Sequence, residues 1–159
     1  MVDSRDKGKR GEYQIRDKLR TKTGLEWERV PGSGAFGANH SLKGDIYLPP
    51  GTGAMSLYCF EIKWFADEHI NSNILNIGES QFEKWWTQCA REGVQMNMQP
   101  ALVFKKDRGD WMVALDAMDT NTSILLDHPH FIIHKKDMEV VVGKFEPWLH
   151  NIKKEKLYK

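Results

Sequence analysis

The chain has 159 residues, a formal net charge of +1, and 40% hydrophobic, 11% aromatic and 28% charged residues. These values are typical of one globular domain with a hydrophobic core, and they exclude disordered and fibrous classes of protein. No apolar run reaches the roughly 18 residues that a membrane span requires, and the polar N-terminus lacks the apolar segment of a signal peptide, so we expect a cytoplasmic protein.

The charges are unevenly distributed along the sequence. Through residue 22 there are eight basic and four acidic residues, and residues 153–159 contain four lysines and one glutamate. Basic ends around a more acidic middle fit a polyanion held around a carboxylate centre, because phosphate contacts come mainly from Lys and Arg. Solvated ends explain the same pattern equally well.

Residues 7–22 are predicted to form a helix, because Ile15 and Leu19 lie one turn apart and charges cover most of the remaining surface. Glu12 lies on the same stripe. It is either a functional acid or a residue at the margin of the stripe, near the helix N-terminus or paired with Arg16.

A first strand is predicted at residues 25–30, and a glycine-rich loop follows at residues 31–40. The loop lacks the Lys-Ser/Thr ending of a nucleotide P-loop, so we expect no nucleotide cofactor. Such a loop suits contact with a phosphate backbone and equally a plain connection.

Two strands that carry charged side chains come next, at residues 44–48 and 57–64, and the Pro/Gly-rich segment between them can fold them into a hairpin. In the second strand, alternation places Glu61 and Lys63 on one face and apolar side chains on the other. Asp45 can reach the same edge. Burying a charge is costly unless it is paired or binds a metal ion, so these residues predict a site.

The chemistry of this group fits a hard cation. Carboxylate oxygens from Asp45, Glu61 and Glu12 suit Mg²⁺ or Mn²⁺, which keep several waters and bridge to a substrate phosphate. Lys63 beside such an ion can orient or help deprotonate the attacking water. The set of parts therefore predicts phosphodiester hydrolysis.

The second half of the chain completes an α/β pattern. Residues 66–78 read as a loop with a short helix, and residues 79–91 as a helix that Gly93 closes. Trp85 and Trp86 are adjacent and cannot both face one core. Strands are predicted at residues 100–105, 111–115, 131–134 and 139–142, and a short helix followed by a basic tail from residue 145.

At this point the pattern resembles a known one. Asp45 followed by Glu61-Ile62-Lys63 is similar to the motif of the PD-(D/E)xK nuclease superfamily, with Gly44 where that superfamily often has proline. Glu12 stands where many members carry an extra metal-linked acid, and Gln81, four residues before Trp85, resembles a glutamine-plus-aromatic helix motif. The resemblance implies a restriction-endonuclease-like core, with a central mixed β-sheet flanked by helices.

Within the superfamily the chain most resembles archaeal-type Holliday junction resolvases, including phage-encoded ones. The segment KGKRGE at residues 7–12 looks like their basic opening, and VPGSGA at residues 30–35 resembles their mobile loop. The likeness covers residues 7–115. We expect one nuclease domain over residues 1–159, in which residues 116–159 add C-terminal strands, a helix and the basic tail.

The resemblance implies a role for individual residues. Glu12, Asp45, Glu61 and the Ile62 backbone carbonyl would bind Mg²⁺ or Mn²⁺, Lys63 would assist the water, Ser33 would contact phosphate, and Gln81 would orient Lys63 or the substrate. The expected DNA contacts are Lys7, Lys9, Arg10, Ser33 and His40.

The expected partner is branched DNA, a four-way junction, bound by a symmetric homodimer in recombination and repair, with one of the two adjacent tryptophans as interface anchor. In this view the cytoplasmic protein associates with the nucleoid through DNA. The alternatives are a restriction- or repair-type endonuclease that cuts duplex or flap DNA, and a DNA-binding module without catalysis.

Overall fold

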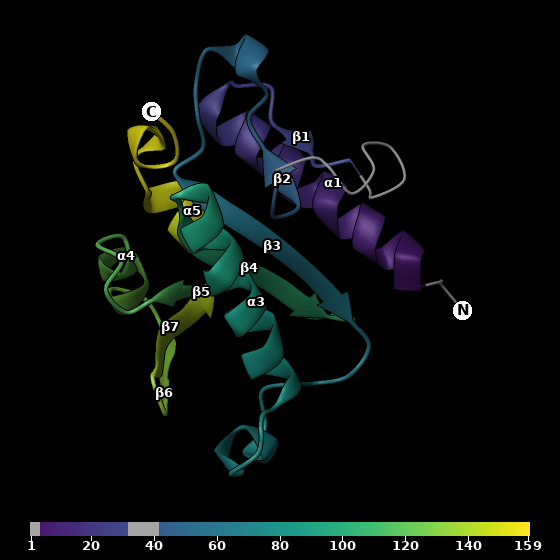
Figure 1. The fold of residues 1–159 in the computed structure, drawn as a ribbon, viewed down its shortest axis with the longest axis vertical. Coiled ribbons are helices and arrows are strands. Elements are labelled where there is room, and N and C mark those ends of the chain that lie inside the picture. The colour runs from purple at the N-terminus through teal and green to yellow at the C-terminus, as the bar shows by residue number, and fades with distance from the viewer. Residues whose placement is uncertain (1–3, 32–41) are drawn as a thin grey trace.

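A computed structural model describes residues 4–31 and 42–159 (Figure 1). Its α-helices are Ser4–Thr23 (α1), Gln81–Met96 (α3), Thr122–Leu126 (α4) and Phe145–Asn151 (α5). The strands are Glu28–Arg29 (β1), Ile46–Tyr47 (β2), Tyr58–Phe65 (β3), Gln99–Lys106 (β4), Met112–Asp116 (β5), His130–Lys135 (β6) and Met138–Lys144 (β7). Short 3-10 helices are Pro50–Thr52 (η2), Ser72–Leu75 (η3) and Lys154–Lys156 (η4).

The described strands form one seven-stranded sheet in the order β1-β2-β3-β4-β5-β7-β6. Strands β3 and β4 are parallel, because helix α3 carries the chain across between them, and the other neighbouring pairs are antiparallel. The sheet is therefore mixed, and the predicted α/β fold class is confirmed.

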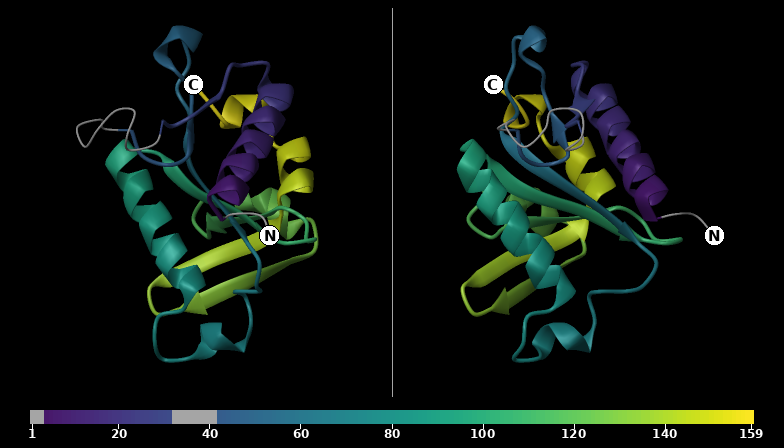
Figure 2. Two further views of the ribbon diagram at one scale, coloured as in Figure 1. Left: turned by 90° about the vertical axis from the view of Figure 1, so that its right-hand side faces the viewer. Right: turned by 45° about the vertical axis from the view of Figure 1, so that its right-hand side comes forward.

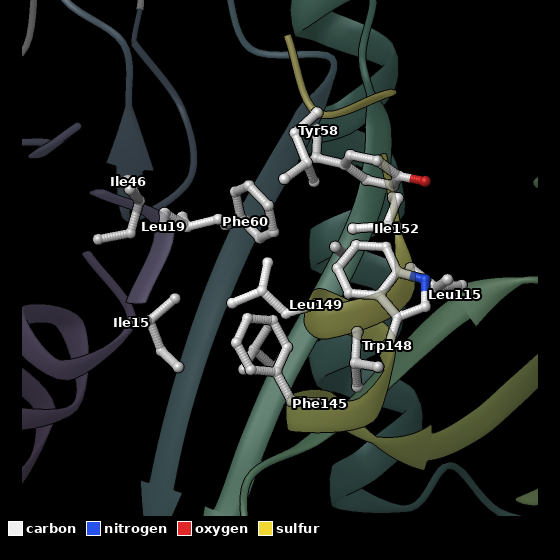
Figure 3. Close-up of a cluster of buried hydrophobic side chains, with 14 of the residues drawn as sticks. Ile15, Leu19, Ile46, Tyr58, Phe60, Leu115, Phe145, Trp148, Leu149 and Ile152 are labelled. Atoms are coloured by element: carbon white, nitrogen blue, oxygen red, sulfur yellow. The ribbon is translucent and has the colours of Figure 1, made fainter. Parts of the chain in front are cut away.

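Helices cover both faces of the sheet (Figure 2). One face packs against α1 and α5, where Ile15 and Leu19 meet Phe60, Phe145 and Trp148, all of them fully buried (Figure 3). The other face packs against α3 through a second buried cluster. The members of that cluster include Phe82, Trp86, Cys89, Leu102 and Phe104. Strand β3 lies between the two clusters, so every second side chain of it faces α3.

The structure corrects two predicted boundaries. The first strand is only two residues long, and helix α3 continues through Gly93 to Met96 and ends at Asn97, which has a left-handed φ of 56°. Gly93 does not stop the helix. A Cβ atom at this position would lie 2.9 Å from the carbonyl oxygen of Met98, so the missing side chain lets the chain fold back tightly toward β4.

Residues 116–159 are joined to the same sheet. Strand β7 pairs with β5 and with the edge strand β6, and Phe145 and Trp148 of α5 belong to the core that α1 covers. Helix α4 was not predicted. None of the helices in the described ranges has the length and apolar character needed to cross a membrane.

Candidate nuclease site

The site begins where β2 stops pairing with β3. The ladder between them contains the pair Ile46 and Phe60, and beyond it the backbone N–H of Asp45 donates to the Phe60 carbonyl at 2.7 Å. The Asp45 carboxylate then accepts a hydrogen bond of 2.7 Å from the backbone N–H of Ile62. The Asp45 carboxylate thus accepts the hydrogen bond that a neighbouring strand would otherwise accept from Ile62, and it lies beside Glu61.

Gly44 makes this turn possible. Its φ is +79°, and a Cβ atom there would lie 3.0 Å from both the Sγ of Cys59 and the carbonyl oxygen of Phe60. Only glycine adopts this conformation without strain at so close an approach. The positive φ and the close contact with β3 therefore explain why this chain has Gly44 where the superfamily often has proline.

Glu61 and Lys63 lie on the same face of β3, as the alternation predicts. The Glu61 side chain is 6% exposed, and the Lys63 ammonium group lies 3.2 Å from its Oε1 atom. A buried carboxylate with one cationic neighbour is stable only with further polar partners.

Glu12 reaches the site from α1, and its partner is Arg29 rather than Arg16. One guanidinium nitrogen of Arg29 lies 3.3 Å from the Glu12 carboxylate, and the guanidinium carbon lies 4.7 Å from the ring centroid of Tyr13. Arg16 instead binds Asp17 at 2.8 Å. The Nε of Arg29 is buried and has no hydrogen-bond acceptor among the described residues.

Two residues of α3 join the same pocket and were missed by sequence reasoning. Gln88 and Glu92 line it together with Glu12, Asp45 and Glu61. The Gln88 amide donates to Glu92 at 3.3 Å, and Glu92 lies within hydrogen-bonding reach of Glu61. Both lie at the margin of the apolar stripe of α3. Glu12, in contrast, was singled out because it lies on the stripe of its own helix.

The pocket holds more negative than positive charge. Burial, followed by the charges of Glu61 and Glu12, raises the pKa of Asp45 well above its usual value. Burial and the nearby charge of Glu92 outweigh Lys63 and raise the pKa of Glu61 to about 7. Burial also raises the pKa of Glu12, although Arg29 opposes this change.

Such a donor set fits a divalent cation by its chemistry, since hard cations take carboxylate oxygens. The carboxylates line one pocket without converging on one point. Within residues 4–31 and 42–159, no three His, Cys, Asp or Glu side chains are already grouped as metal ligands.

Other predicted residues fall elsewhere. Gln81 is exposed at the first position of α3 and lines a different pocket with His69 and Asn71, two helical turns from Gln88. The structure therefore does not bring it to Glu61. Ser33 and His40 lie outside the described residues.

The adjacent tryptophans pack within the chain. Trp86 is buried in the core beneath α3, and Trp85, which is half-buried, stacks on Phe65 with 5.0 Å between ring centroids. An interface role of either ring stays a prediction.

The predicted DNA contacts of α1 lie around the end of β3. The Lys7 ammonium group binds Asp107 at 2.7 Å, Lys9 is exposed, and the guanidinium carbon of Arg10 lies 5.1 Å from the ring centroid of Trp64. Lys105, on β4, also lies over Trp64, with its Nζ atom 4.3 Å from the ring centroid.

An aspartate at the edge of a hairpin, a Glu-x-Lys strand beside it and an acid from the preceding helix are the parts of a PD-(D/E)xK nuclease. The chain belongs to the family described as "Phage putative PDDEXK endonuclease", whose model matches residues 3–159. It is thus a nuclease of the PD-(D/E)xK type.

Two individual proteins show its similarity to known chains. Protein D14 of Escherichia phage T5 is 64% identical over 158 residues, which cover 99% of each chain. Among solved structures, Hjc of Archaeoglobus fulgidus, a Holliday junction resolvase from an archaeal hyperthermophile, aligns over 96% of this chain and 99% of its own, with 12% identity and a TM-score of 0.43.

Proposed function

We propose that the chain is a divalent-metal-dependent endonuclease that hydrolyses DNA phosphodiester bonds, most specifically at four-way junctions. The observation that carries the catalytic part is the hydrogen bond that the backbone N–H of Ile62 donates to the Asp45 carboxylate. Ile62 is the residue between Glu61 and Lys63. This hydrogen bond places the two acids of the motif in one pocket, with Lys63 beside Glu61, and such an arrangement is the first requirement for positioning a reacting phosphate.

In this proposal Asp45, Glu61 and the Ile62 carbonyl hold Mg²⁺ or Mn²⁺, with Glu12 as an additional acid. The ion, when bound, lowers the pKa of a coordinated water and offsets charge on the phosphate. Lys63 orients the attacking water and neutralises charge that develops beside Glu61. Arg29 opposes the rise in the pKa of Glu12 that burial causes and holds its carboxylate at the pocket, since the guanidinium group binds that carboxylate.

A cationic surface at the end of β3, on the face that α1 covers, supports the DNA substrate. Arg10 and Lys105 both lie over the ring of Trp64, the residue that follows Lys63 in β3. Their cationic groups are held in place by the indole, and Lys7 and Lys9 lie on the same helix as Arg10. Phosphates of a duplex arm are the natural ligands of such a surface. Contact of Ser33 and His40 with DNA stays a prediction.

The junction preference is supported by sequence likeness alone, through the KGKRGE segment and the VPGSGA segment. Resolution requires two symmetric cuts, so we propose a C2 homodimer that acts in recombination and repair. A restriction- or repair-type endonuclease on the same core is the principal alternative. A module without catalysis is disfavoured because Asp45 and Glu61 line one pocket and Lys63 lies 3.2 Å from Glu61.

One assay separates these possibilities. The protein is incubated with a four-way junction, a flap and a linear duplex of matched sequence, with Mg²⁺, with Mn²⁺ and with EDTA. Paired symmetric nicks confined to the junction support a resolvase, and cutting of the linear duplex or flap supports the alternative endonuclease. Tight junction binding without cleavage under every metal condition would overturn the proposed catalysis. Sedimentation of the protein–junction complex tests the dimer.

A further inference from the structure

Glu92 lies beside another acid of the pocket. It lies in the last turns of α3, near the negative end of the helix dipole, and within hydrogen-bonding reach of the buried Glu61. In the part of the chain that the structure describes, no Lys, Arg or His lies within ion-pair distance of it. Among the described residues, the amide of Gln88 donates a hydrogen bond to it at 3.3 Å. The folded chain alone gains little from a carboxylate here.

The position makes sense as part of the site. Helices α1 and α3 cover opposite faces of the sheet (Figure 2). Each contributes an acid to the pocket at the edge of β3, Glu12 from α1 and Glu92 from α3. Asp45 and Glu61 lie between them, on the strands. The pocket is therefore lined by acids from both faces of the sheet.

Within the proposed nuclease function, on which this step rests, we infer that Glu92 is a further ligand of the divalent ion and that Gln88 is its positioning residue. Glu61 and Glu92 repel one another when both are ionised, and a cation shared between them converts that repulsion into attraction. The hydrogen bond from Gln88, four residues earlier on the same helix, holds the Glu92 carboxylate toward the pocket.

For Glu92→Gln we expect opposite effects on two quantities, the melting temperature without metal and the stabilisation by Mn²⁺. Without metal, the melting temperature stays the same or rises, because a like charge beside Glu61 is removed. With metal, the stabilisation by Mn²⁺ falls. If Glu92 had only a structural role, its replacement would instead lower the melting temperature without metal.

The test is calorimetric titration of Mn²⁺ into the full chain at pH 8, together with melting curves in EDTA and in Mn²⁺. We expect Glu92→Gln to weaken Mn²⁺ binding roughly tenfold or more, because even residues that support metal ligands contribute about that factor. Gln88→Ala should weaken it less. Glu79→Gln, an exposed carboxylate just before α3, is the matched control and should leave binding unchanged.

Wild-type affinity for Mn²⁺ in Glu92→Gln would overturn the inference, and so would a wild-type chain that binds no Mn²⁺. These outcomes are distinct from failure of the proposed function. A wild type that binds Mn²⁺ through Glu92 and cuts no DNA would contradict the nuclease proposal alone. A wild type that cuts DNA while Glu92→Gln binds Mn²⁺ normally would contradict this inference alone.

Discussion

The backbone N–H of Ile62 donates a 2.7 Å hydrogen bond to the carboxylate of Asp45, and Ile62 is the residue between Glu61 and Lys63. The donor is free because β2 and β3 have stopped pairing at this point. A break in the sheet thus places one acid of the motif beside the other. The geometry of the site depends on where a strand ends as much as on the charged residues themselves.

The pair of Glu12 and Arg29 should be strongly coupled. Glu12→Gln and Arg29→Met each leave one half-buried charge unpaired, so each should lower the free energy of unfolding by about 1–2 kcal/mol. The double variant should lose less than the sum of the two, with a coupling energy of about 1 kcal/mol. Urea unfolding of the four proteins measures this cycle, and additive losses would show that the ion pair contributes nothing.

The stability of the metal-free chain should depend on pH through Glu61. Its pKa is raised from 4.5 to about 7 on folding, mainly by burial, so the folded state binds more protons than the unfolded state between these values. The free energy of unfolding therefore falls as pH rises through this window, and Asp45 acts in the same direction.

Melting curves of wild type and Glu61→Gln in EDTA test this sign. The melting temperature of the variant, relative to that of the wild type, should rise from about pH 5 to about pH 7.5, because the amide of the variant has no proton to lose. The exposed Glu79→Gln serves as control and should follow the wild type. A difference between wild type and Glu61→Gln that is constant across this range would contradict the raised pKa.

The cationic surface around Trp64 should contribute to DNA binding and not to the chemical step. Arg10→Ala and Lys105→Ala should each weaken binding about three- to tenfold and lower the salt dependence of log K by about one unit, as expected for a lost phosphate contact. Lys136→Ala, an exposed lysine in the turn at the far edge of the sheet, is the control. Equal affinity and salt slope in all four proteins would place the DNA elsewhere.

Gly93 should be required for packing rather than for helix termination. A Cβ atom there would meet the Met98 carbonyl at 2.9 Å and Pro100 at 3.3 Å, so Gly93→Ala should lower the free energy of unfolding by about 1–3 kcal/mol. Gly51→Ala, where a Cβ atom meets nothing within 4 Å, should change it by less than about 0.5 kcal/mol. Chemical denaturation of both variants compares them, and equal losses would contradict the contact.

Local pattern predicted much of this fold. Apolar spacing located α1 and α3, and strand alternation correctly separated Glu61 and Lys63 from the apolar face of β3. The mixed sheet was implied by the resemblance to the PD-(D/E)xK superfamily, whereas the helices and the strand alternation were predicted from the residues themselves. These features depend on residues close in sequence, which is why they are readable without coordinates.

The remainder depends on contacts between distant segments. Arg29 as the partner of Glu12, and Gln88 with Glu92 at the site, result from how α1 and α3 lie across β3. Helical spacing cannot specify which turn of α3 meets Glu61, and Gln81 was proposed only through its resemblance to a helix motif of the superfamily. Gly93 was misread because a glycine in a helix signals an end unless a close neighbour explains it.

The most direct test of the central claim is the single-turnover rate, in Mg²⁺, on whichever DNA the wild type cuts fastest, for Asp45→Asn and Lys63→Ala. The Asn side-chain oxygen can still accept from Ile62, so Asp45→Asn should stay folded and bind DNA within about threefold of wild type. The proposed site predicts that each variant cuts at least about 100-fold more slowly than wild type. Cleavage by either variant at the wild-type rate would contradict it.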